Sequence, residues 1–433
     1  MSGRAIPLSV VHEPVPREPP AYRERVEPTR VHGSLYTDPA VFADELERIW
    51  YRGWVCLGHQ SEVAAPDAFV RKAIGPQELV MTRSADGALH VLFNRCSHRG
   101  SRLCDAAEGS ARAFRCPYHG WNFANTGSLL AYPYPEGYGG KGRLDLDLAH
   151  VPRVATHEGF VFASLAADGL TLAEHLGAAA EAITRLARLS PTGELELTAG
   201  WLRHRTRANW KFVVENETDG YHPQFVHSSI FRVADSGIGA LYREGSTAVT
   251  RDLGGGHSEN DLRPEFRRVG QPMGWFGTTP ERVPDYTAAM RERHGAAADA
   301  LLVDGAPHVM VFPNLFIAEI TVFLIQPLAV DLCVQHATAV QFTGTPDINR
   351  RMLQQCIGSV GPAGLLLADD AAMYERNQAG VAAREPEWVG TGRGVHRETV
   401  DDDGHPIGAA TDEVGMRGFW NHYLRVMDGG GEP

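Results

Sequence analysis

The sequence is poor in cysteine, has no long apolar run and carries no excess of positive charge. Six cysteines in 433 residues are too few for the disulfide framework of a secreted domain. No run of eighteen apolar residues is present and the N-terminus lacks a signal peptide's apolar core, so we expect a cytoplasmic protein with no membrane partner. A formal net charge of -12 argues against a nucleic-acid partner, because phosphate binding needs a basic surface.

Length and local pattern predict two domains and an arm. A chain of 433 residues exceeds one average domain. Residues 1–37 are expected to form an extended arm that packs on a neighbour, residues 38–162 a small β domain and residues 163–433 a second domain. A helix is predicted from the cap Asp38-Pro39. Further predicted elements are a helix at 172–189, an antiparallel sheet within 309–340, and helices at 347–358, 369–384 and 414–427.

Two pairs of metal-ligand residues stand in the first domain. Cys96-x-His98 and Cys116-x-x-His119 are separated by seventeen residues. Two thiolates and two imidazoles are the ligands of a Rieske [2Fe–2S] cluster. Zinc is the alternative, because two cysteines and two histidines also close a tetrahedral site. Zinc fingers usually pair Cys with Cys and His with His. Here each of the two motifs contributes one cysteine and one histidine, which favours the iron–sulfur cluster.

The two loops carry no second pair of cysteines. Ser101 and Tyr118 stand where the respiratory, high-potential cluster type has two disulfide-forming cysteines. The cluster therefore resembles the lower-potential type of Rieske oxygenases and their ferredoxins. The remaining four cysteines are expected to be buried free thiols: Cys56, Cys104, Cys333 and Cys356.

A second constellation contains His222 and His227. On one continuous helix two residues five apart would point about 140° apart, which is unsuited to one ion. Pro223 is expected to bias His222 out of the helical region and to begin a new helix, so that the two rings can converge. Two imidazoles, one carboxylate and open positions make the facial triad of non-haem Fe(II) oxygenases.

The carboxylate of such a triad must come from elsewhere in the chain. The segment 361–370 is apolar and ends in Asp369 and Asp370. It can deliver one carboxylate inward, while the other acid favours the start of a helix. The sequence does not decide between the two acids.

Together these motifs, in this order, resemble the α (large, catalytic) subunit of a Rieske non-haem iron aromatic ring-hydroxylating oxygenase. The resemblance implies an α+β fold, in which a Rieske β-sandwich domain joins a helix-grip catalytic domain with an antiparallel sheet flanked by helices. It also assigns the metal ligands. The cluster ligands are Cys96, His98, Cys116 and His119, and the mononuclear iron ligands are His222, His227 and Asp370.

The resemblance gives Asp219 a catalytic, bridging role. In the family the matching aspartate hydrogen-bonds an iron-ligating histidine, here His222, and a cluster histidine of the neighbouring subunit, here His119. A carboxylate between two metal-bound imidazoles would orient and couple them. A turn aspartate before Gly220 is the alternative. The resemblance further implies a homotrimer, α3, or α3β3 with a small β subunit.

The implied reaction uses dioxygen as cosubstrate and electrons from a separate ferredoxin or flavin reductase. The chain has no dinucleotide-binding fingerprint, so NAD(P)H is expected to act only through that reductase. The expected outcome is cis-dihydroxylation of a small aromatic compound in catabolism. A Rieske monooxygenase or an O- or N-demethylase has the same metal sites, whereas a pure electron carrier would need only the first domain.

The substrate is only weakly encoded. The spacing Glu215-Asn216-x-x-Asp219 resembles the branch acting on benzoate- and anthranilate-like compounds, which favours an aromatic acid or amine. Asn216 is a candidate substrate-binding residue. Glu217 stands where small or apolar residues are expected, and it either faces solvent or contacts an amino group. No arginine stands out as a partner for a substrate carboxylate.

Overall fold

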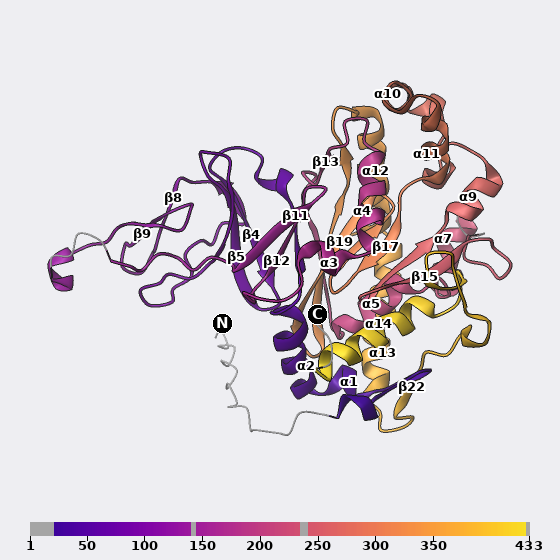
Figure 1. The fold of residues 1–433 in the computed structure, drawn as a ribbon, viewed down its shortest axis with the longest axis horizontal. Helices are drawn as coiled ribbons and strands as arrows, with labels where there is room; N and C mark the ends of the chain where they lie inside the picture. Colours follow the sequence, from indigo (N-terminus) through magenta and orange to yellow (C-terminus); the bar gives the residue numbers. More distant parts are fainter. Residues whose placement is uncertain (1–20, 140–143, 234–240, 430–433) are drawn as a thin grey trace, which may run out of the picture.

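A computed structural model describes residues 21–139, 144–233 and 241–429. The chain forms a β-rich region, at the left of Figure 1, and a larger region in which helices pack on one long antiparallel sheet. This arrangement confirms the predicted α+β class. Within the described ranges, no helix combines the length and the apolar character needed to cross a bilayer.

The β-rich region contains three small sheets. A four-stranded sheet has the order β6-β5-β4-β7, and two three-stranded sheets have the orders β10-β9-β8 and β11-β12-β3. Four of these strands lie near residues 55, 70, 80 and 90. The bounds are β3 Val55–His59, β4 Ala68–Ile74, β5 Gln77–Arg83, β6 Leu89–Phe93, β7 Glu108–Ser110, β8 Ala113–Arg115, β9 Asn122–Ala124, β10 Leu129–Ala131, β11 Arg153–His157 and β12 Phe160–Ser164.

One antiparallel sheet of nine strands organises the larger region, with the order β14-β20-β19-β18-β17-β16-β15-β24-β23. The β19–β20 hairpin lies near one edge of this sheet, and in it Thr321 pairs with Ala339. The strands are β14 Leu202–Thr206, β15 Val249–Gly254, β16 His257–Asp261, β17 His308–Val311, β18 Leu315–Ala318, β19 Thr321–Ala329, β20 Leu332–Ala339, β23 Thr399–Val400 and β24 Pro406–Ala409.

Helices cover this sheet, and the three predicted near the C-terminus are present. They are α12 Pro346–Val360, α13 Leu366–Val381 and α14 Val414–Met427. The helix predicted at 172–189 is instead two helices, α3 Leu172–Leu176 and α4 Ala179–Arg188, because Gly177 adopts φ +44° between them. Sequence reasoning also missed α9 Arg263–Val269, α10 Pro284–His294 and α11 Ala298–Asp304.

The N-terminal arm differs from its prediction. Residues 1–20 lie outside the described ranges, but residues 21–37 fold onto the chain's own larger region. Strand β2 (Arg30–His32) pairs with β22 (Trp388–Gly390), and Leu35 and Tyr36 in helix α1 (Ser34–Thr37) are completely buried. The expectation that this stretch packs on a neighbour is wrong for residues 21–37, because its aromatic and aliphatic side chains complete the core.

A buried ion pair fixes the helix α5 (Trp210–Thr218). The Lys211 ammonium meets the Glu45 carboxylate on helix α2 (Pro39–Glu45) at 2.5 Å, and both side chains are fully buried. Glu45 also accepts hydrogen bonds from the Trp210 indole and the Tyr423 hydroxyl, each at 2.8 Å. A buried charge needs such a complete set of partners. The network therefore ties α2, α5 and α14 together beneath the candidate iron site.

Candidate metal centres and substrate cavity

The two loops that carry the cysteine–histidine pairs have the same backbone shape. In each, a glycine with positive φ closes the turn: Gly100 donates its N–H to the Cys96 carbonyl at 2.9 Å and Gly120 to the Cys116 carbonyl at 3.0 Å. Glycine adopts this conformation without steric conflict. The two turns bring the histidine rings together, with the centroids of His98 and His119 4.6 Å apart.

The polar groups around these loops suit an iron–sulfur cluster. Burial raises the pKa of the Cys116 thiol, but hydrogen bonds from the backbone N–H groups of Tyr118 and His119 and from the side chains of Cys96 and Ser101 lower it, so that the pKa lies below its usual value. Backbone N–H groups aimed at sulfur stabilise a thiolate ligand. The Nδ1 atom of His98 is buried and has no hydrogen-bond partner among the described residues, as expected of a nitrogen that faces a metal.

Aromatic residues that the sequence reasoning did not assign surround the cluster loops. The Trp121 ring stacks on His98 at 4.8 Å with an interplanar angle of 3°, and the Tyr138 hydroxyl lies 3.4 Å from His98 Nε2. On the outer side, the ring of Tyr118 lies 3.7 Å from that of His119 and is 62% exposed. One histidine is therefore covered, and the other faces solvent.

The helix break beside the second histidine pair lies one turn earlier than expected. Helix α5 ends at Thr218, Asp219 is extended, and α6 (Pro223–Val226) begins at the proline. His222 itself has φ −62° and ψ −32°, so the expectation that Pro223 displaces it from the helical region is wrong. Gly220 permits the break, because a Cβ there would lie 2.0 Å from the Ala410 carbonyl oxygen.

Three candidate ligands converge. Ligand atoms of His222, His227 and Asp370 all lie within 4.8 Å of one another. The Asp370 Oδ1 atom is 3.2 Å from His227 Nε2 and 3.7 Å from His222 Nε2. This oxygen is buried and accepts no hydrogen bond from the described part of the chain, although a buried carboxylate oxygen normally has a partner. Two imidazoles and one carboxylate arranged in this way can hold one divalent metal ion.

The two neighbouring acids on α13 occupy different positions. Asp370 has a side chain 11% exposed and points between the two histidines. The Asp369 side chain is 35% exposed, and its nearest approach is 3.9 Å from Oδ2 to His227 Nδ1, the ring nitrogen away from the convergence point. The geometry therefore favours Asp370, while Asp369 lies in the first turn of α13, where a negative charge is favourable.

Asp219 and Asn216 both contact the first histidine. The Asp219 Oδ2 atom lies 3.4 Å from His222 Nδ1, and its other oxygen accepts the Tyr221 N–H. Asn216 Nδ2 lies 3.5 Å from His222 Nε2. A carboxylate on the ring nitrogen away from the metal position fixes the orientation of a ligating histidine.

A cavity of about 430 Å³ opens beside the three candidate ligands. This volume falls within the roughly 300–1,000 Å³ of small-molecule sites. Its walls are largely apolar and come from α7 (Ser228–Val233), the sheet and α13. Glu217 lines this cavity, so the solvent-facing alternative for that residue is wrong. The apolar part of the wall includes Ile230, Phe231, Phe316, Ile320, Phe323 and Leu367.

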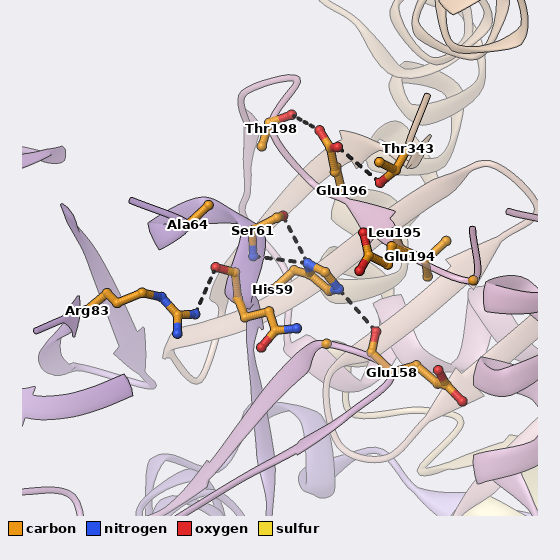
Figure 2. A pocket seen from close by; sticks show the side chains of 13 residues that line it. His59, Ser61, Ala64, Arg83, Glu158, Glu194, Leu195, Glu196, Thr198 and Thr343 are labelled. Carbon is orange, nitrogen blue, oxygen red and sulfur yellow. Dashed lines mark hydrogen bonds between the residues drawn. The ribbon is translucent and has the colours of Figure 1, made fainter. Parts of the chain in front are cut away.

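A second cavity, of about 620 Å³, lies between β3 and the segment around residues 193–198 (Figure 2). The His59 ring is held by the Ser61 hydroxyl at 2.9 Å and the Glu158 carbonyl at 3.1 Å. Thr343 donates to Glu196 at 3.1 Å on the opposite side. These polar groups already bond to one another, so this cavity is not the candidate catalytic site.

Comparison with known proteins agrees with both centres. Residues 53–152 match the Rieske [2Fe-2S] domain, and residues 194–429 match the catalytic domain of the ring hydroxylating alpha subunit. The chain therefore belongs to the Rieske ring-hydroxylating oxygenases, as an α subunit. Members of this family carry a Rieske [2Fe–2S] cluster and a mononuclear iron, and the two loop pairs and the three converging side chains fit these groups.

Particular relatives match different shares of the chain. The sequence is 29% identical to the 2-halobenzoate 1,2-dioxygenase large subunit of Burkholderia cepacia, over 90% of this chain and 85% of that one. It is 36% identical to the N,N-dimethyl phenylurea N-demethylase subunit alpha of a Sphingobium species, over 45% of this chain and 43% of that one. A structure of naphthalene 1,2-dioxygenase with indole bound has the same fold, with a TM-score of 0.80, 22% identity and 94% of each chain covered.

Proposed function

We propose that this α subunit hydroxylates a small aromatic compound, with cis-dihydroxylation as the main outcome. The observation that carries the proposal is the convergence of His222, His227 and Asp370 on one point at the edge of an apolar cavity. Iron bound there would supply dioxygen activation. The apolar wall would position the ring and exclude water from it.

We assign the cluster to Cys96, His98, Cys116 and His119. The support is the pair of matched turns, the backbone N–H groups aimed at the thiols and the unpartnered nitrogen of His98. The mononuclear iron is assigned to His222 and His227 with Asp370 in preference to Asp369, on the distances given above. Asn216 is assigned to the substrate side of the same site.

Asp219 is proposed to carry electrons between subunits. In Figure 1, strands β8 and β9, which flank the second cluster loop, lie at the far left, whereas α5 and α7 lie at the right. One end of the proposed link is exposed and the other is partly exposed: the His119 ring is exposed, and the Asp219 side chain is 18% exposed beside Tyr221, which is 40% exposed. A second copy of the chain can therefore place its His119 against Asp219, as a trimer would.

The proposed partners are a ferredoxin or flavin reductase and a small β subunit, and the proposed location is the cytoplasm. The names of the relatives support a second subunit, because they describe a large subunit and a subunit alpha. The competing outcome is monooxygenation or N-demethylation, which the relative that demethylates a phenylurea supports.

A product screen tests the proposal. Chemically reduced holoprotein would receive dioxygen and a panel of benzoates, anilines and bicyclic arenes. A cis-diol is the expected product, whereas formaldehyde release would assign the demethylase alternative. Oxygen consumption with no organic product from any class would contradict a hydroxylase function.

A further inference from the structure

One carboxylate in the substrate cavity has no role in metal binding or in the proposed electron path. Glu217 lies in the last turn of α5, next to Asn216, and lines the cavity. Its Oε1 atom accepts a hydrogen bond from Gln335 Nε2 at 3.1 Å. Gln335 is on β20, which lies between β14 and β19 in the sheet, and is fully buried. The glutamate is therefore held at a fixed place by a rigid element.

The second oxygen of Glu217 remains available to a ligand. Within the described ranges, Gln335 is the only residue that donates a hydrogen bond to this carboxylate. Burial, together with the nearby charge of Asp370, raises the pKa of the Glu217 carboxyl well above its usual range. Burial disfavours the charged form of Glu217, so a donor that arrives with the substrate would stabilise the carboxylate.

The charges around the cavity are of one sign. Four carboxylate residues line it, Glu217, Asp219, Glu319 and Asp370, and no lysine or arginine does so among the described residues. Residues 234–240, which are not described, contain neither cation in the sequence. Of the acids, Glu319 already has a partner, because its Oε1 lies 3.2 Å from His308 Nδ1. Glu217 is therefore the acid that is free to select a ring substituent.

We propose that Glu217 is a specificity-determining residue that accepts a hydrogen bond from an N–H group on the aromatic substrate, so that the enzyme takes arylamines and their N-substituted derivatives and rejects aromatic carboxylates. This deepens the proposed function and rests on it only in taking the cavity as the substrate site. An aromatic acid would bring a further negative charge next to Glu217, in a pocket whose lining has no lysine or arginine to balance it and whose iron is already bound by Asp370. An N–H donor instead gives Glu217 a charge-assisted bond.

The test is anaerobic binding of four ring compounds of similar size to the iron-loaded holoprotein, measured by titration calorimetry: aniline, toluene, nitrobenzene and benzoate. Aniline should bind about tenfold more tightly than toluene, as the gain of one hydrogen bond to a charged group predicts. Benzoate should bind more weakly than toluene. Equal binding of aniline and toluene, or a preference for nitrobenzene or benzoate, would overturn the assignment without any variant being made.

Two variants locate the preference. Glu217→Gln keeps the shape of the side chain and should remove the advantage of aniline over toluene while toluene binding stays within about twofold. The matched control is Glu319→Gln, which removes one negative charge from the same cavity and should keep the advantage of aniline. If both variants lose it equally, general charge and not Glu217 sets the preference.

The same samples separate this proposal from the proposed function. After addition of dioxygen and reductant, a preference for aniline without any oxygenated product would leave Glu217 as the selector and refute the hydroxylase. Oxygenated products without a preference for the amine would support the hydroxylase and refute the role of Glu217 as the selector. Cluster absorbance and iron content, measured on each variant, show that both centres are filled.

Discussion

The two proposed metal centres are built in different ways. The cluster site takes its four side chains from two turns of the same shape within residues 96–120, and glycines with positive φ fix both turns. The iron site takes two histidines from the ends of α6 and one acid from α13, far later in the chain. Local backbone geometry makes the first centre, whereas packing between distant elements makes the second. The second centre should therefore be the more easily lost.

The largest effect that separates the two centres is selective loss of iron. Asp370→Ala leaves two imidazoles, too few for a facial triad, so iron should fall from about three atoms per chain to about two. Product formation should disappear while the visible spectrum of the cluster is unchanged. Asp369→Ala is the matched control and should keep the third iron. Metal analysis of both variants decides which acid ligates, and loss of iron from the Asp369 variant alone would reverse the assignment.

The link between the centres can be broken without emptying either. Asp219→Asn keeps the shape of the side chain but removes the charge that faces His222 Nδ1 at 3.4 Å. Both metals should stay bound, and turnover should fall by about 100-fold or more, at the upper end for residues that orient metal ligands. Rapid mixing of the reduced variant with substrate and dioxygen should show a cluster that stays reduced. Turnover at the wild-type rate would contradict the bridging role proposed for Asp219.

Dependence of the iron site on distant packing is testable at Glu45. Glu45→Ala leaves the Lys211 ammonium buried without its partner, which should lower the free energy of unfolding by about 3–5 kcal/mol. In urea, the variant should release its mononuclear iron before the cluster colour fades.

The control for this experiment is Glu181→Gln. That residue pairs with Arg188 at 2.7 Å, but the two side chains are 58% and 51% exposed, so the change should be within about 0.5 kcal/mol. Simultaneous loss of both centres in the Glu45 variant would contradict the proposed difference between them.

The smallest expected effect is a pH dependence of the free energy of unfolding that originates at Glu215, which lies in the same helix, α5, as Lys211. Burial raises the pKa of Glu215 to about 7, although hydrogen bonds from Tyr36 and Trp420 lower it in part. Because this acid is harder to ionise in the folded state, its contribution to stability is complete below its ordinary pKa and is lost as the pH rises through about 7. Between about pH 5 and 8, wild type should lose about 1–3 kcal/mol relative to Glu215→Gln. If the free energies of unfolding of wild type and Glu215→Gln change in parallel over this pH range, Glu215 does not titrate within it.

The difference between the two centres also explains what could be read from the sequence. The spacing Cys96-x-His98 and Cys116-x-x-His119 encodes its own turns, and the capped helix at Asp38 is likewise local: the Asp38 side chain accepts the Ala40 N–H at 2.9 Å. The family, the α+β class and the major strands followed from such local patterns. Asp370 could be proposed only beside Asp369, because the choice depends on how α13 packs against α6.

Features that arise from tertiary packing were predicted poorly. Residues 21–37 read as a polar stretch with little periodicity, yet Leu35 and Tyr36 fill the core of a region hundreds of residues away. From the sequence, Glu217 could face solvent or contact an amino group; the choice depends on tertiary packing, because the side chain bonds to Gln335 on β20 and lines the cavity. One signal was present: a glutamate stood where small or apolar residues were expected.

A single-turnover experiment with heavy-oxygen gas tests ring oxygenation at the proposed iron site most directly. Reduced holoprotein with an aromatic amine should incorporate the label into an organic product as the cluster becomes oxidised, and the Asp370→Ala variant should yield no labelled product and keep its cluster reduced. Labelled product from that variant, or cluster oxidation in wild type without label in any organic product, would contradict ring oxygenation at an iron held by His222, His227 and Asp370.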